Sequence, residues 1–471
     1  MNVLWAIGAA VVALVVGVVV GSRWLIPGDN DLRKLTWTQA FDQLHARVSE
    51  TYPFTEWKGI DWESLYAQTA PSIAEAESLG DRESYYLALR EYLRAIPDGH
   101  VAIGGEDFGL RAEAIGGGYG LAITSLDDGR VIASILLDDG PAARAGMAWG
   151  AEILTWSRLP IGDAIAQTST LWADPAAATE ERQYLDQCRY LVRASHGTSV
   201  GVTYRNPGET ASREATLVAE DDGLETLART MPPERDALRA LLTPPIRAEV
   251  LDSGYGHIAI SGFMPTFGGP RPAQIVARAI EDFIAQDVQG VIIDVRGNGG
   301  GLDALVPQMV GHFYDKPGFY EYVAAYNPET HKHEIDPKQT LTIEPREPYF
   351  GGTVMVLVDS HTASTAEGIP LAIQRLPQGH VVGIHGTNGS FAVGKPGDDL
   401  YRLPDGVVLS FLSGRSLDAS GEVQVDANAD GIGGIVPDVR VPLTEDTVRA
   451  INVEHRDVVL ETAVAALDAL W

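Results

Sequence analysis

The sequence predicts an α/β core with a mostly parallel sheet, joined to a smaller β-rich domain and a helical N-terminal segment. Largely apolar runs at 290–295 and 354–358 are typical of strands that are buried on both faces. An amphipathic helix pattern at 272–285 lies between strand candidates, and strands that alternate with helices form parallel sheets. Short strand patterns and glycine-rich turns at 116–217 indicate the separate β-rich unit.

The composition limits the class of function. The chain has 471 residues, enough for two or three domains, and 45% of them are hydrophobic, enough for real cores. The formal net charge of -29 argues against a nucleic-acid partner, because phosphates bind positive surfaces. Cys188 is the only cysteine, so the chain can form no intrachain disulfide and no cysteine zinc site. We expect its thiol to fill a core.

The N-terminal unit, residues 1–26, carries a run of apolar or small residues from 3 to 20, which is long enough for a membrane-spanning helix. The Gly-Ser-Arg segment that follows is a poor cleavage site. We therefore expect an uncleaved membrane anchor, with a cleaved signal peptide as the alternative. The few flanking charges leave the orientation of this anchor open.

Residues 27–110 are predicted to form a helical segment. Its apolar residues recur at three- and four-residue spacing, as in Trp37, Phe41, Leu44 and Val48. A Pro-Asp-Gly turn at 97–99 ends the helical pattern, and His100 follows directly. A histidine just past such a turn can project into a cleft, although a surface histidine is the ordinary alternative.

Residues 111–220 are predicted to form the β-rich domain. The loop at 118–122 reads Gly-Tyr-Gly-Leu-Ala, and a small-residue stretch at 140–147 precedes a Gly-Ala-Glu-Ile-Leu strand. In these features the region resembles a PDZ domain, which binds extended peptide ends by strand addition. A domain that only packs against its neighbours is the alternative. An insertion or long helix is expected before a last strand at 199–204.

Residues 221–471 are predicted to hold the α/β core. Ser364 follows the strand at 354–358 and should lie at a strand-to-helix junction, where free N–H groups favour a nucleophile or an oxyanion. An N-cap serine is the ordinary alternative. The glycine cluster at 297–301 has the spacing of neither a dinucleotide loop nor a phosphate loop, but it can expose backbone N–H groups. Further elements are expected at 255–260, 381–384, 407–411 and 456–470.

Oxygen side chains at 426–430 match the first half of a calcium loop. Asp426, Asn428 and Asp430 occupy positions 1, 3 and 5, and glycine follows at position 6. The twelfth position is Pro437 instead of the bidentate glutamate. A polar surface loop is therefore favoured over a calcium site, and we expect no metal.

Two stretches, Ile-Asp-Val-Arg-Gly-Asn-Gly-Gly-Gly at 293–301 and Val-Asp-Ser-His-Thr-Ala-Ser-Thr-Ala-Glu at 358–367, together resemble the S41 peptidase family. This family contains the carboxyl-terminal processing proteases and the tricorn core protease. The order of helical segment, Asp-Gly-His, PDZ-like domain and core also matches. The resemblance implies a crotonase-like core, a serine-type endopeptidase acting on peptide or protein substrates, and no cofactor.

By this resemblance Ser364 is the nucleophile. The processing proteases activate it with a lysine, but the corresponding position here is Gly389. The tricorn-like branch uses a histidine before the PDZ-like domain, so His100 is predicted as the general base. The rival bases are His361, His385 and Lys395.

The resemblance also implies an oxyanion hole and an orienting acid. The oxyanion donors should be the backbone N–H of Thr365 and that of Gly299 or Gly300. A base histidine is usually oriented by a third group, for which Glu422 and Asp426 are the candidates.

Localisation and the alternatives follow from the same resemblance. A membrane-anchored chain with its catalytic part outside the cytoplasm, in the periplasm, is the family-like expectation. The missing lysine leaves open a catalytically inactive protein, because some relatives of this fold bind ligands without proteolysis. A peptide-binding scaffold tethered to a membrane is the third reading.

Overall fold

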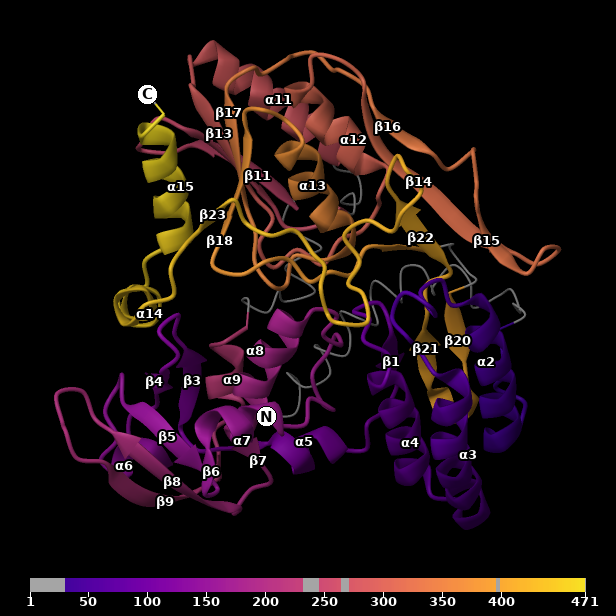
Figure 1. The fold of residues 1–471 in the computed structure, drawn as a ribbon, viewed down its shortest axis with the longest axis vertical. Helices are drawn as coiled ribbons and strands as arrows, with labels where there is room; N and C mark the ends of the chain where they lie inside the picture. The colour runs from indigo at the N-terminus through magenta and orange to yellow at the C-terminus, as the bar shows by residue number, and fades with distance from the viewer. Residues whose placement is uncertain (1–29, 232–244, 264–270, 395–398, 471) are drawn as a thin grey trace.

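The computed structural model describes residues 30–231, 245–263, 271–394 and 399–470 (Figure 1). The predicted anchor at 3–20 lies outside these ranges. Within them, no helix has both the length and the apolar composition needed to cross a bilayer. Figure 1 shows an α/β core at the top, a β-rich domain at the lower left and a helical group at the lower right.

A six-stranded sheet with the order β11-β12-β13-β17-β18-β23 forms the centre of the core. β11 runs antiparallel to β12, and all other neighbours are parallel, which confirms the expected mostly parallel sheet. The strands are β11 (Ile246–Val250), β12 (Gly256–Ile260), β13 (Gly290–Asp294), β17 (Thr353–Leu357), β18 (Gly379–Gly383) and β23 (Val439–Arg440).

Helices cover both faces of this sheet, which explains why its central strands are apolar without interruption. Val354 and Val356 pack on the side of three helices, while Met355 and Leu357 pack against a single one. The three are α11 (Pro272–Ala285), α12 (Leu305–Val310) and α13 (Gly368–Gln374), and the single one is α15 (Val458–Asp468). α14 (Glu445–Asn452) precedes α15.

A second sheet, of order β15-β14-β22-β19 with β16 beside β14, extends from the core towards the helical group (Figure 1). Its strands are β14 (Gly318–Asn327), β15 (Lys332–Ile335), β16 (Leu341–Ile343), β19 (Ala392–Val393) and β22 (Gly414–Leu417). The β14–β15 hairpin contacts the last turn of the first helix of that group. Tyr326 Oη donates to Glu50 Oε1 at 2.6 Å, and His333 Nε2 lies 3.1 Å from the Thr51 carbonyl.

The helical group contains α2 (Trp37–Thr51), α3 (Trp62–Leu79) and α4 (Arg82–Arg94), as the spacing of apolar residues predicts. It shares a core with a sheet of order β1-β21-β20, made of β1 (Ala102–Gly104), β20 (Leu400–Arg402) and β21 (Val408–Ser410). The predicted strand at 407–411 is present as β21, but it pairs in this sheet and not in the parallel sheet of the core. A short apolar run indicates a strand but does not indicate which sheet it joins.

The β-rich domain is an antiparallel sheet of order β3-β4-β5-β8-β9, with β6 beside β5. Its strands are β3 (Leu121–Ser125), β4 (Val131–Leu136), β5 (Glu152–Trp156), β6 (Leu159–Pro160), β8 (Ser199–Arg205) and β9 (Arg213–Val218). Its helices are α6 (Pro141–Arg144), α7 (Ile161–Ala166) and α8 (Glu180–Leu191). The expected helix and the strand at 199–204 are present as α8 and β8, but β8 is not the last strand of the sheet, because β9 follows it. Cys188 of α8 is buried against β3 as core filler.

Short elements join the β-rich domain to the rest of the chain. A small sheet of order β10-β2-β7 combines β2 (Gly117–Gly118), β7 (Arg193–Ala194) and β10 (Glu220–Asp221), flanked by α5 (Leu110–Ile115) and α9 (Glu225–Ala228). Helix α8 contacts the core directly. Arg182 Nη1 donates to the Ser360 carbonyl at 3.0 Å, and Glu181 Oε1 lies 2.8 Å from His385 Nδ1. The start of α8 therefore lies beside the turn that follows β17.

Candidate active site

Ser364 lies after the carboxyl end of β17, in the short 3-10 helix η2 (Ser364–Glu367) that leads into α13. Its φ of 57° is in the left-handed region, which non-glycine residues adopt mainly where the surroundings enforce it. Its N–H donates to the Ser390 carbonyl at 2.8 Å and to Glu367 Oε2 at 3.0 Å. The predicted strand-to-helix junction is present, and the strained backbone presents the side chain to a cavity of about 460 Å³.

Glu367 holds the backbone around Ser364 in place through hydrogen bonds. Its carboxylate is fully buried and accepts hydrogen bonds from the Ser364 N–H, the Gly389 N–H, the Ser390 N–H and Thr387 Oγ1. Burial raises the pKa of Glu367 to about 7, although the donated hydrogen bonds partly offset this effect. The side chain ties the start of η2 to the loop at 387–390, so the two segments keep one geometry.

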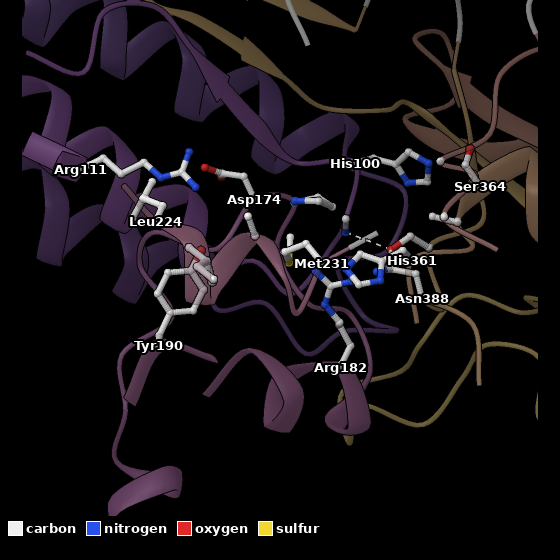
Figure 2. A pocket seen from close by; sticks show the side chains of 18 residues that line it. His100, Arg111, Asp174, Arg182, Tyr190, Leu224, Met231, His361, Ser364 and Asn388 are labelled. Atoms are coloured by element: carbon white, nitrogen blue, oxygen red, sulfur yellow. Dashed lines mark hydrogen bonds between the residues drawn. The ribbon is translucent and has the colours of Figure 1, made fainter. Parts of the chain in front are cut away.

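His100 lines the same cavity as Ser364, and Figure 2 shows both side chains at one end of it. Ser390 links the segments that carry the two residues. The Gly99 N–H donates to Ser390 Oγ at 3.0 Å, and the Ser390 carbonyl accepts from the Ser364 N–H. The His100 ring has 15% of its side chain exposed, and its Nδ1 lies 3.3 Å from Asp98 Oδ1. The fold therefore brings together two predicted residues that lie 264 positions apart (364 minus 100).

The acid next to the His100 ring is Asp98, two residues earlier in the chain. Asp98 is buried, and its carboxylate accepts from the His100 N–H at 2.8 Å and from Tyr52 Oη at 2.6 Å. Burial by itself lowers the pKa of His100, but the carboxylate of Asp98 and the charges of Asp426 and Glu367 outweigh it and raise that pKa. Asp98 thus lies within ion-pair distance of His100 Nδ1, on the side where an orienting carboxylate would be needed.

Asp426 is a further buried carboxylate near Asp98 and His100, and it forms an ion pair with Lys58. The Lys58 Nζ to Asp426 Oδ1 distance is 2.6 Å, and both side chains are 0% exposed. Asp426 Oδ2 accepts from the Phe391 N–H at 2.8 Å. Burial, against the opposing charge of Lys58 and with the help of the charge of Asp98, raises the pKa of Asp426 to about 6. Asp426 therefore acts on His100 by charge, whereas Glu422, the other candidate acid, lies on an exposed turn.

Two backbone N–H groups beside Ser364 are unoccupied. Within the described part of the chain, the N–H groups of Thr365 and Gly299 donate to no acceptor. The Gly300 N–H, by contrast, donates to Asn298 Oδ1 at 2.9 Å. Gly299 lines the cavity with Ser364, so between the two predicted glycines it is the one whose N–H is available to an oxyanion.

Replacing Gly300 by alanine is expected to lower kcat about 100-fold or more. Its φ of 102° strains an L residue, and an added Cβ would meet Ser364 Cβ at 2.8 Å and Thr365 N at 3.0 Å. The Thr365 N–H would then move by more than an oxyanion contact tolerates. Gly299→Ala is the matched control, because a Cβ there meets nothing within 4 Å and the N–H is retained. Equal kcat values for both variants in a peptide-hydrolysis assay would contradict this account.

The rival bases are less well placed than His100. His361 lines the cavity, but burial and the nearby Arg182 and Arg189 lower its pKa to about 2, so it cannot hold a proton near neutral pH. His385 is not among the residues that line the cavity, and its Nδ1 lies 2.8 Å from Glu181 Oε1. Lys395 lies outside the described residues.

The calcium-loop reading finds no support in the geometry. Asp426 is directed towards Lys58, and Asn428 Oδ1 accepts from the backbone N–H groups of Asp430 and Ile432. No group of three or more metal-ligating side chains occurs in residues 30–231, 245–263, 271–394 and 399–470. The segment is a hydrogen-bonded polar turn.

Asp98→Asn is expected to shift the acidic limb of the pH–activity profile to lower pH. A general base works only when neutral, so kcat/KM falls as pH drops through the His100 pKa, which Asp98 holds above its usual value of 6.5. Loss of the carboxylate removes the largest of the effects that raise this pKa. We also expect kcat to fall by up to about 10⁴, because the ring loses its orienting partner. An acidic limb that stays in place would assign the pH dependence to another group.

Lys58 and Asp98 are the site residues that sequence reasoning missed. Asp98 lies in the Pro-Asp-Gly turn before His100, so its proximity to the base could have been a signal. Lys58 has no local signal, because its partner lies 368 positions later (426 minus 58).

Part of this chain is similar to a known protein family. Residues 254–441 match the family model of Peptidase family S41. The carboxy-terminal processing protease CtpB of Bacillus subtilis (strain 168) is 24% identical over 262 residues, which are 56% of this chain and 44% of that protein. The match thus spans less than half of that relative's length.

Solved structures show the same fold. Mature CPAF complexed with lactacystin has a TM-score of 0.59 at 14% identity, over 92% of this chain and 98% of that one. A second crystal structure of mature CPAF has a TM-score of 0.59 at 15% identity, over 92% of this chain and 97% of that one. Residues 254–441, which contain the central strands of the core sheet and the Ser364 junction, are thus the part of this chain that is similar to peptidase family S41.

Proposed function

We propose that the protein is a serine-type endopeptidase in which Ser364 is the nucleophile and His100 is the general base. The observation that carries this proposal is a single cavity lined by Ser364 at positive φ, by His100 with Asp98 beside its ring, and by Gly299, whose N–H donates to no described acceptor. Nucleophile, oriented base and oxyanion donors are the three parts that acyl transfer requires.

The reaction would proceed through an acyl-enzyme. Ser364 Oγ attacks the scissile carbonyl carbon, and its proton passes to His100 Nε2, since Nδ1 is on the side of Asp98. The Thr365 and Gly299 N–H groups would stabilise the tetrahedral oxyanion. His100 returns the proton to the leaving amine as the C–N bond breaks. Water, deprotonated by His100, then cleaves the ester and releases the acid, which restores Ser364.

The position of the family lysine supports a histidine base. Gly389 has a φ of 72°, and a Cβ there would lie 2.6 Å from Thr179 Cγ2 and 3.1 Å from the Gly434 nitrogen. A lysine at this position would need the surrounding backbone to shift. We therefore infer a Ser–His mechanism with Asp98 as the orienting acid, in place of a Ser–Lys pair.

We further propose that the β-rich domain is PDZ-like and binds peptide ends. β3 is the edge strand of its sheet, which leaves a strand edge available for addition of a peptide. Gly120, in the loop before β3, has a φ of 75° and packs against Pro141, so the loop is closely backed by α6. Loss of peptide-end binding on replacing Gly120 by valine, with hydrolysis of short peptides retained, would support this role.

The membrane anchor at 3–20 and a location outside the cytoplasm are also proposals. The uncharged apolar run is what supports them. Fractionation of cells that express the full chain, followed by protease accessibility of intact cells, would separate an external anchored protein from a soluble or inward-facing one.

Labelling with a fluorophosphonate probe tests the activity. The full chain should be labelled, and Ser364→Ala and His100→Ala should not be. Labelling lost in Ser364→Ala but retained in His100→Ala would move the base to His361, His385 or Lys395. A folded chain that is not labelled would favour the alternative, a ligand-binding protein without hydrolytic activity.

A further inference from the structure

Two carboxyl groups lie side by side within the protein, next to the glycine cluster at 297–301. Asp303 follows this cluster in the chain, and Glu321 lies on β14 of the second sheet. The Glu321 side chain is fully buried, and neither residue lines the cavity that contains Ser364. Two neighbouring carboxyl groups are costly to bury when both are ionised. No step of the proposed hydrolysis uses them, so their role lies elsewhere.

The hydrogen bonds around the pair leave one position for a shared proton. Glu321 Oε2 accepts from Ser416 Oγ at 2.5 Å. Asp303 Oδ1 accepts from Tyr320 Oη at 3.0 Å. The two remaining oxygens, Glu321 Oε1 and Asp303 Oδ2, are buried and receive no hydrogen bond from an N–H or O–H donor of the described residues. A proton on Glu321 Oε1 that is donated to Asp303 satisfies both oxygens at once.

The surroundings of Glu321 favour its protonated form. Burial, the hydrogen bond with Asp303 and the charge of that carboxylate raise the pKa of Glu321 to about 10, against the opposing hydrogen bond from Ser416. Glu321 therefore carries the shared proton at neutral pH. Because it is then a donor, it attaches Asp303 to β14.

Within the described part of the chain, no cation compensates the pair if this proton is lost. The groups that face the pair are Ser416 of β22, Gln424, whose Nε2 donates to Ser416 Oγ at 2.8 Å, and the Tyr320 hydroxyl, whose pKa burial raises far above its usual value. Arg375, at the end of α13, is exposed and donates to Gln424 Oε1 at 2.9 Å. Its charge acts on Tyr320 but is not among the influences on the pair. β16 and α12 carry no charged residue.

The pair is connected to both segments that form the proposed oxyanion hole. Asp303 continues the chain from the glycine cluster, in which the Gly301 carbonyl accepts from Thr365 Oγ1 at 3.0 Å. The Tyr320 hydroxyl, which donates to Asp303, lies against the backbone of Gly368, because a Cβ added there would overlap it. Gly368 begins α13, directly after the 3-10 helix that contains Thr365. A movement of Asp303 would therefore displace the glycine cluster, which carries one of the oxyanion donors.

We propose that Asp303 and Glu321 form an acid pair that holds the glycine cluster in the geometry of the oxyanion hole, and that loss of their shared proton releases the cluster at high pH. Both are positioning residues, because neither touches the reacting atoms. The effect on catalysis rests on the proposed peptidase function, whereas the effect on the glycine cluster does not. The pair thus sets a basic limit to the active pH range, opposite the acidic limit that His100 sets.

Hydrogen–deuterium exchange at about pH 7 tests the positioning without a substrate. Glu321→Gln keeps a donor for Asp303 and an acceptor for Ser416, whereas Glu321→Ala removes both. We expect the segment 296–305 to exchange several-fold faster in Glu321→Ala than in Glu321→Gln, which should match the wild type. Glu329→Gln, at an exposed position of the β14–β15 hairpin, is the matched control. Equal exchange in all four chains would overturn the positioning role.

The pH profile of fluorophosphonate labelling tests the shared proton. In the wild type we expect the labelling rate to fall about ten-fold between about pH 9 and about pH 11, because the pair becomes doubly ionised and an oxyanion donor moves. Glu321→Gln cannot ionise, so this fall should be absent from its profile while the acidic limb stays in place. This comparison does not depend on the folding of Glu321→Ala. A basic limb that is the same in both chains would overturn the proposal.

Proton release on unfolding gives a readout that needs no activity. Unfolding at about pH 8 should release one more proton from the wild type than from Glu321→Gln, because the raised pKa keeps Glu321 protonated only in the folded chain. Equal proton release from the two chains would show that Glu321 is ionised in the fold, and it would overturn the acid pair.

The combined outcomes separate this inference from the proposed function. Faster exchange in Glu321→Ala, in a protein whose wild type the probe does not label, would remove the hydrolase and leave the positioning pair. Labelling and exchange that do not depend on Glu321 would remove the pair and leave the hydrolase. A basic limb that is lost in Glu321→Gln, together with faster exchange in Glu321→Ala, would support both.

Discussion

Replacing Lys58 by methionine is expected to destabilise the folded chain by about 3–5 kcal/mol, the usual result of removing one partner of a buried ion pair. The Lys58 ammonium contacts Asp426 Oδ1 at 2.6 Å and donates to the Ala427 carbonyl at 2.8 Å. Without it, Asp426 and Asp98 are two buried carboxylates close enough to raise each other's charging cost, with no cation between them. Urea unfolding followed by tryptophan fluorescence measures the loss.

A second substitution identifies the cause of that loss. Lys58→Met combined with Asp426→Asn removes the stranded charge and should recover a large part of the stability, because replacing both partners of a buried pair is far less harmful than removing one. Lys332→Met, at an exposed position of β15, is the control and should change stability by less than about 0.5 kcal/mol. A Lys58 variant as stable as this control would show that the buried pair contributes little.

Ser364→Ala and His100→Ala are each expected to lower kcat by about 10⁶, and the double variant should be no slower than either single one. The reason is that nucleophile and base act in one proton transfer, so removing either removes the whole step. Residual hydrolysis from the Thr365 and Gly299 donors should remain, with KM little changed. Steady-state kinetics on a peptide that the wild type cleaves give these values.

Histidine variants outside the pair provide the comparison. His385→Ala should keep kcat within about ten-fold of wild type, because its Nδ1 contacts Glu181 and not the reacting groups. Losses in Ser364→Ala and His100→Ala that multiply in the double variant would show that the two residues act in separate steps. A large loss of kcat in His385→Ala with little loss in His100→Ala would show that His385, and not His100, is the base.

Local patterns predicted the core well. The strand at 354–358 and the junction at Ser364 could be read from the sequence because a strand covered on both faces must be apolar throughout, and its polar turn then stands out. The strand at 407–411 was also predicted, but the sheet that it joins could not be read from the sequence. Its apolar residues fit any buried sheet, and it pairs with β1 through contacts that lie some 300 positions away in the sequence.

The candidate site divides in the same way. Ser364, His100 and the glycine cluster lie in short segments whose composition points to chemistry. The sequence leaves undecided which residues surround them. In the structure Asp98, and not Glu422, accompanies His100. Gly299, and not Gly300, keeps a free N–H, and Lys58 contacts Asp426. All three features depend on packing between distant segments.

The sequence by itself therefore determined the kind of core, and it predicted Ser364 as the nucleophile and His100 in place of a lysine as the base, because each prediction depends on residues within one turn or strand. The tertiary structure alone decided the partners of those residues and the charge of the cavity. Electrostatic interactions act through space over a few ångströms, whatever the separation along the chain. A chain with a net charge of -29 can for this reason still place two arginines, Arg111 and Arg182, in the lining of the cavity that contains Ser364.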